Sequence, residues 1–136
     1  MERYIHATQE NGKNFVMRNI KGEFTMLNLL KFKETADYSE FPNLAPESPV
    51  SGKVAYDKYI EEVMPFLDNA GSEVLFTGRG GHLLIGPENR EWDYVLLVKH
   101  KNVENFLAYA KNEEYLKIAG HRTAALEDSR LLPLED

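Results

Sequence analysis

Residues 24–32 read Phe-Thr-Met-Leu-Asn-Leu-Leu-Lys-Phe, a short apolar run that lies between Gly22 and a charged stretch. Its length and its flanking residues are typical of a β-strand. Residues 92–100 form a second run, with the centre Tyr-Val-Leu-Leu-Val. Consecutive residues in both runs are apolar, so both faces of each strand require burial. The two runs therefore predict central strands of a sheet that is covered on both sides.

The other segments predict an alternation of strands and helices around these central strands. In chain order we first expect a short helix capped by Thr8, the strand at 24–32 and an amphipathic helix at 55–67 that ends near Gly71. A strand pair at 73–77 and 82–85 follows, joined by a turn at Gly78-Arg79-Gly80-Gly81, and then a turn at 86–89 leads to the strand at 92–100. The chain closes with two helices capped by Asn102 and Asn112 and a last strand at 129–134. This order is close to the βαββαβ arrangement of a ferredoxin-like antiparallel sheet with its helices on one face.

The apolar second face of this sheet needs a cover of its own. Helices on one side leave the other side exposed, and a two-fold dimer that packs sheet against sheet buries it with identical surfaces. The alternative is a monomer whose N-terminal segment covers the second face. We expect a homodimer of one α+β domain over residues 1–136, with an N-terminal extension at 1–23 and a long proline-containing loop at 34–52, a length typical of lids and binding elements.

Composition excludes several classes of protein. The 136 residues contain no cysteine, which rules out disulfides, thiolate nucleophiles, iron–sulfur clusters and cysteine zinc sites. The formal charge of -6, with no basic stripe, disfavours nucleic acid as a partner. No apolar run approaches the ~20 residues of a membrane span, so we expect a cytoplasmic protein without a membrane partner. The four histidines show no metal-binding spacing, and we expect no metal and no cofactor.

Four stretches carry a resemblance to a known family. They are Met26–Phe32, Ser51–Tyr56, Trp92–Val98 and His121–Leu131. With them, the chain from about Phe24 onward resembles the domain of unknown function 1330 family. That family belongs to the dimeric α/β-barrel superfamily, so the resemblance implies a ferredoxin-like dimeric α/β barrel. It implies no activity, although the wider superfamily includes cofactor-independent monooxygenases, small isomerases and haem-handling proteins.

His121 and Arg122 are the candidate catalytic residues. An imidazole titrating near neutrality can move a proton beside a fixed cation that holds a carboxylate or an enolate. The alternative is a structural role, in which both residues favour the helix dipole and pair with Glu127 or Asp128.

Several polar and aromatic residues are candidates for ligand binding. Asn28 is the polar residue of an apolar strand, and it either orients a ligand carbonyl or bonds a neighbour in the core. Four aromatic residues either line an amphipathic cavity or belong to the core; they are Tyr56, Trp92, Tyr94 and Tyr109. We expect a cofactor-independent enzyme, isomerase or monooxygenase-like, that acts on a small carbonyl-bearing or aromatic molecule. The alternative is a non-catalytic ligand-binding or structural homodimer.

Overall fold

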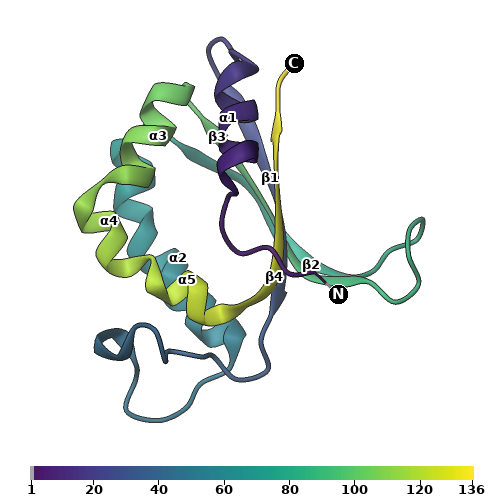
Figure 1. Ribbon diagram of the computed structural model, residues 1–136, viewed down its shortest axis with the longest axis vertical. Helices are drawn as coiled ribbons and strands as arrows, with labels where there is room; N and C mark the ends of the chain where they lie inside the picture. Colours follow the sequence, from purple (N-terminus) through teal and green to yellow (C-terminus); the bar gives the residue numbers. More distant parts are fainter. Residues whose placement is uncertain (1) are drawn as a thin grey trace.

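The structure is a computed structural model that describes residues 2–136, and it contains a four-stranded antiparallel sheet with a layer of helices on one face (Figure 1). The strands are β1 (Phe24–Phe32), β2 (Glu73–His82), β3 (Glu91–His100) and β4 (Leu126–Leu134), in the order β2-β3-β1-β4. The helices are α1 (Gln9–Met17), α2 (Gly52–Asn69), α3 (Val103–Lys111), α4 (Glu113–Ile118) and α5 (Gly120–Ala125), with a 3-10 turn η1 (Pro42–Leu44) in the long loop. The predicted α+β, ferredoxin-like βαββαβ fold is confirmed. No helix within residues 2–136 is long and apolar enough to cross a membrane.

The predicted turn at Gly78-Arg79-Gly80-Gly81 is wrong. These residues continue β2, which pairs with β3 along its whole length, and the chain turns between residues 83 and 90 instead. Gly80 is needed where it is because a Cβ there would lie 2.3 Å from the carbonyl oxygen of Trp92 on the neighbouring strand. A glycine that permits close backbone approach has the same local sequence signal as a glycine in a turn.

The predicted helix boundaries are largely confirmed. Thr8, Asn102 and Asn112 each accept a hydrogen bond from the first turn of the helix that follows. Gly71 ends α2 with a positive φ of 76°, while Ser72 N–H donates to the carbonyl of Leu67, as in a Schellman motif. The sequence predicted His121 and Arg122 near the end of the last helical segment; the structure divides that segment into α4 and α5, and no side chain caps the first turn of α5.

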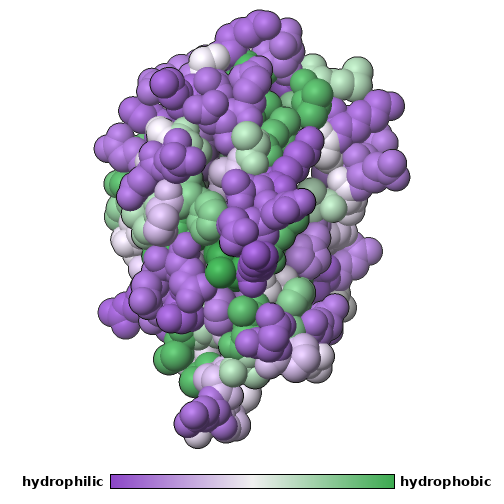
Figure 2. All heavy atoms as spheres, turned by 90° about the vertical axis from the view of Figure 1, so that its left-hand side faces the viewer, coloured by the Kyte–Doolittle hydropathy of each residue, from purple (hydrophilic) through white to green (hydrophobic). Residues whose placement is uncertain are grey.

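The two faces of the sheet differ in their cover. Residues of β1 and β3 that face the helices, such as Leu30 and Val98, are buried, whereas Leu27 and Leu97 on the opposite face are partly exposed. The outer surface of the helix layer is mostly hydrophilic (Figure 2). An apolar second face thus remains on the far side of the sheet.

The N-terminal extension does not cover that second face. The Phe15 ring of α1 packs against Phe24 and Phe106, with ring centroids 5.9 and 5.8 Å away. Phe106 belongs to α3, so α1 lies on the side of the sheet that the helices already occupy. Within the described chain, the alternative cover considered for a monomer is therefore absent.

Candidate functional site

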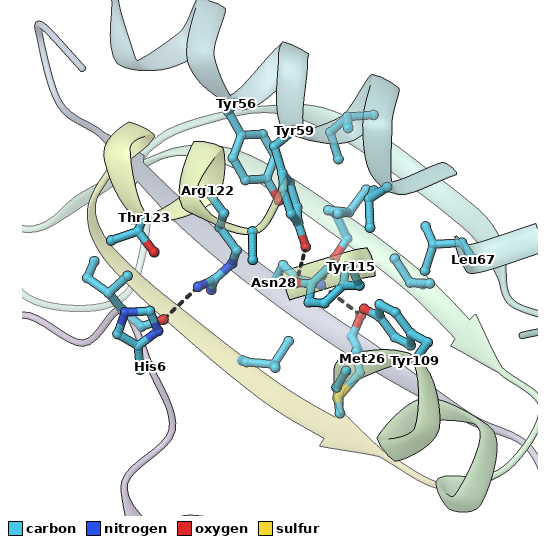
Figure 3. Close-up of a pocket in the computed structure, with 18 of the residues that line it drawn as sticks. His6, Met26, Asn28, Tyr56, Tyr59, Leu67, Tyr109, Tyr115, Arg122 and Thr123 are labelled. Carbon is cyan, nitrogen blue, oxygen red and sulfur yellow. Dashed lines mark hydrogen bonds between the residues drawn. The ribbon is translucent and has the colours of Figure 1, made fainter. Parts of the chain in front are cut away.

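A cavity of about 510 Å³, the large cavity, lies between the sheet and helices α2 to α5 (Figure 3). Its floor is mostly apolar and includes Met26 of β1 and Leu96 of β3. Residues 5–7 of the N-terminal segment close one side, and Phe41 of the long loop contributes to the wall. The cavity is therefore bounded by segments from almost the whole length of the chain.

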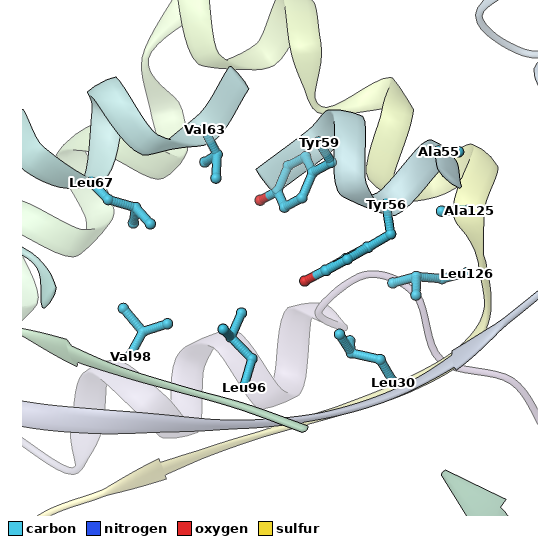
Figure 4. Packing of buried hydrophobic residues seen from close by; sticks show 10 residues of the cluster. All are labelled: Leu30, Ala55, Tyr56, Tyr59, Val63, Leu67, Leu96, Val98, Ala125 and Leu126. Atoms are coloured by element: carbon cyan, nitrogen blue, oxygen red, sulfur yellow. The ribbon is translucent and has the colours of Figure 1, made fainter. Parts of the chain in front are cut away.

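Four tyrosines from three helices line the large cavity: Tyr56 and Tyr59 from α2, Tyr109 from α3 and Tyr115 from α4. Tyr56 and Tyr59 point from α2 toward the sheet (Figure 4), and the hydroxyls of Tyr59 and Tyr115 are 2.8 Å apart. Burial raises the pKa of Tyr56 to about 12 and also raises the pKa of Tyr59 and of Tyr109. These phenols remain protonated near neutral pH, so each can donate a hydrogen bond to a ligand oxygen.

Arg122 is the arginine of the large cavity, and α5 holds it there. Its Nη1 donates to the carbonyl of Ile5 at 2.6 Å, and its Nη2 lies 3.5 Å from Ser129 Oγ. No carboxylate of the described residues forms an ion pair with it. The half-buried guanidinium therefore has only neutral protein partners.

Asn28 also lines the large cavity, from the centre of β1. Its Nδ2 donates to the carbonyl of Leu96 at 3.1 Å, which fixes the orientation of the amide. The side chain thus has a partner in the core and at the same time presents a polar group to the cavity.

His121 lies away from the large cavity, although it is next to Arg122 in the sequence. Its Nδ1 is 2.7 Å from the hydroxyl of Tyr38 in the long loop, and its Nε2 is 3.8 Å from Glu62. Burial lowers its pKa. It lines a second, small cavity of about 260 Å³ between the loop and α2. The structure does not bring His121 and Arg122 to one site.

The alternative pairing of His121 and Arg122 with the acids that follow them is not seen either. Glu127 forms its ion pair with Arg3, and Asp128 forms one with Arg130 at 2.6 Å. His121 instead contacts Tyr38 of the long loop.

Trp92 and Tyr94 are not among the residues that line the large cavity. The guanidinium carbon of Arg130 lies 5.1 Å from the centroid of the Trp92 ring. Tyr94 packs against Phe32, and the ammonium of Lys53 lies 5.3 Å from its ring centroid. Of the aromatic residues predicted for a binding site, Tyr56 and Tyr109 are in the cavity.

Five polar residues that line the cavity were not predicted as site residues from the sequence: His6, Tyr59, His100, Tyr115 and Thr123. Tyr59 and Tyr115 have the helical spacing of core residues, and nothing local separates a core tyrosine from a cavity tyrosine. His100 ends a buried strand, where its Nδ1 is 2.8 Å from Ser72 Oγ, and burial lowers its pKa to about 4. No cluster of three potential metal ligands occurs within residues 2–136.

A family model described as "Domain of unknown function (DUF1330)" matches residues 47–133. The chain belongs to this family. The resemblance seen in the sequence is thereby confirmed, and the DUF1330 match includes α2, the cavity-lining α3 to α5 and most of β4.

Solved structures of similar proteins have the same fold. The RPA0582 protein of unknown function from Rhodopseudomonas palustris is 29% identical, with a TM-score of 0.86 over 99% of this chain and 98% of that one. A dimeric protein of unknown function with a ferredoxin-like fold from Bacteroides fragilis is 12% identical, with a TM-score of 0.51 over 84% of this chain and 96% of that one. No curated protein matches the sequence. These comparisons show the family and the fold, and they bring no activity with them.

Proposed function

We propose that this member of the DUF1330 family binds a small carbonyl-bearing or aromatic molecule in the large cavity. The observation that carries the proposal is the cavity itself, whose volume of about 510 Å³ is typical of small-ligand sites. Its apolar floor suits an apolar ligand body. The polar groups of Asn28, Tyr56 and Arg122 come from three different elements, and their convergence gives such a ligand a defined orientation.

The catalytic form of this proposal is cofactor-independent isomerase or monooxygenase-like chemistry. Such chemistry needs a group that accepts a proton inside the cavity. His121 is outside it, so the candidates become His6 and His100, whose imidazoles line the cavity wall. Ligand binding needs no proton acceptor, and for that reason we propose binding as the function and catalysis as its extension.

We also propose that the protein works as a homodimer through the second face of the sheet. Phe76 and Leu132 on that face are 53% and 52% exposed in the single chain. The turn after β2 extends on the same side of the sheet as this face (Figure 1), and its Leu84 and Ile85 are 99% and 93% exposed. Exposed apolar residues in such number favour a protein partner, and the related fold from Bacteroides fragilis is described as dimeric.

The test of ligand binding is native mass spectrometry of the protein purified from its own source. A matched pair of variants on α3 tells cavity binding from surface binding. Ala110 lines the cavity, whereas Ala108 on the same helix is exposed. We expect a retained small molecule in the wild type and in Ala108→Phe, and its loss in Ala110→Phe, because the ring fills the cavity. Equal retention in both variants, or a protein that neither retains nor rebinds any small molecule, would overturn the proposal.

A further inference from the structure

We infer that the ligand of the large cavity is an organic carboxylate, bound through its carboxylate group to Arg122. This inference rests on the proposed ligand-binding function and adds the chemical class of the ligand. It is drawn from the charges around the cavity, from the free hydrogen-bonding capacity of Arg122 and from the protonation of the tyrosines.

The charge of the large cavity is positive. Its lining contains Arg122 and the imidazoles of His6 and His100, and it contains no aspartate, glutamate or lysine. The imidazole of His100 is neutral at pH 7, since burial lowers its pKa to about 4. A guanidinium that is half removed from water without an anion is costly, and a bound anion offsets this cost. A neutral ligand would leave the charge of Arg122 uncompensated.

Arg122 has the capacity to hold a carboxylate. A guanidinium carries five N–H donors in a planar fork that matches the two oxygens of a carboxylate. In the described chain its acceptors are the Ile5 carbonyl and Ser129 Oγ, one on each terminal nitrogen. The remaining N–H groups are available on a side chain that these two contacts hold at the cavity wall.

The tyrosine hydroxyls complete the anion site. Burial keeps Tyr56, Tyr59 and Tyr109 protonated, while the positive charge of Arg122 acts on all three in the opposite direction. That opposing influence reflects the proximity of the guanidinium to the phenols, which share the cavity with it (Figure 3). Protonated phenols donate hydrogen bonds to a carboxylate, and the apolar floor beyond them accommodates the hydrocarbon part.

The experiment compares acids with their isosteric neutral amides. The probes are benzoate and benzamide, 3-phenylpropanoate and 3-phenylpropanamide, and hexanoate and hexanamide, each titrated into the full chain and followed by ¹H–¹⁵N NMR at pH 7.5. For the tightest pair we expect the acid to bind at least ten-fold more tightly than the amide. The ratio of the affinity for the acid to that for the amide should fall to about one in Arg122→Met. It should be partly kept in Arg122→Lys, which retains the charge.

The matched control is Arg18→Met. Arg18 also donates to a distant main-chain carbonyl, that of Pro133 at 2.8 Å, but it is not among the cavity residues. We expect this variant to keep the wild-type preference for the acid.

The outcomes separate this inference from the proposed function. Amides that bind the wild type as tightly as the acids would overturn the carboxylate assignment and leave the binding cavity in place. If no member of any pair binds, the proposed function fails together with the inference. A preference for acids that persists in Arg122→Met would place the anion on another residue and refute the role of Arg122. The comparison of acid with amide is made within the wild type, so it stands even if one variant folds poorly.

Discussion

Lowering the pH should destabilise this protein through His100. The side chain is 2% exposed, and its ring packs against Phe24 and Phe106 with centroids 5.4 and 4.8 Å away. Its Nδ1 has one polar partner, Ser72 Oγ at 2.8 Å. Burial lowers the pKa of His100 to about 4, because the charged imidazolium would lose its hydration among aromatic rings.

The size of the effect follows from the difference between the folded and unfolded pKa. An unfolded histidine has a pKa of about 6.5, so below that pH the unfolded chain binds a proton that the folded chain does not. Stability therefore falls as the pH is lowered, by about 2 kcal/mol between pH 7.5 and pH 5 for this one group. The loss levels off near about 3 kcal/mol once the pH passes below the folded pKa and the native imidazole also becomes protonated.

Urea unfolding of the wild type and of His100→Gln at several pH values, at one protein concentration, measures this effect. We expect the unfolding free energy of the wild type, relative to that of His100→Gln, to fall by about 2 kcal/mol from pH 7.5 to pH 5. Other titrating groups contribute equally to both proteins and cancel. His82→Gln is the control, because His82 lies on the surface. A pH dependence that is the same in His100→Gln as in the wild type would refute the reasoning.

Three further predictions follow from the fold. Gly52→Ala should lower the free energy of unfolding by more than about 1 kcal/mol in thermal or urea unfolding, because its Cβ would lie 2.3 Å from a main-chain carbonyl oxygen. The control Gly12→Ala, inside α1 with no atom within 4 Å of the added Cβ, should raise the free energy of unfolding by up to about 1 kcal/mol. Equal effects of the two substitutions would contradict the steric argument. Phe76→Lys should weaken the proposed dimer at least ten-fold in sedimentation equilibrium, while Met17→Lys on exposed α1 should not; an unchanged dimer would exclude the sheet face as its interface. Asn102→Ala should lower the free energy of unfolding by about 1 kcal/mol in urea unfolding, since the side chain accepts a hydrogen bond of 2.7 Å from the first turn of α3. A variant as stable as the wild type would show that the cap contributes nothing.

The sequence predicted the fold where burial determines local structure. The run at 24–32 is apolar on both faces, and β1 has those same bounds. The prediction failed at residues 78–81, because whether a glycine turns the chain or admits a neighbouring strand depends on where Trp92 of the next strand, β3, lies. The break between α4 and α5 was also not predicted, because α5 follows α4 after a single residue and its first turn lacks a capping side chain.

The candidate site was predicted in part, for a geometric reason. Asn28, Tyr56, Tyr109 and Arg122 come from four elements and meet in one cavity. His121 does not join them, because its side chain points about 100° away from that of Arg122 around α5 and contacts Tyr38 of the long loop instead. Adjacency in the sequence was therefore misleading as a sign of joint chemistry.

Helix α5 shows how few residues can organise two cavities. A Cβ on Gly120 would lie 2.6 Å from the Phe41 ring, so only glycine lets the long loop approach here. His121 bonds Tyr38 of the same loop, and Arg122, pointing elsewhere, bonds Ile5 of the N-terminal segment. Three consecutive residues thus fix the loop and the segment that close the large cavity on two sides. The cation that we assign to ligand binding also holds one of these closing segments, so a bound carboxylate and the Ile5 carbonyl draw on the same guanidinium. We therefore expect ligand affinity and the closure of the cavity to be linked through Arg122.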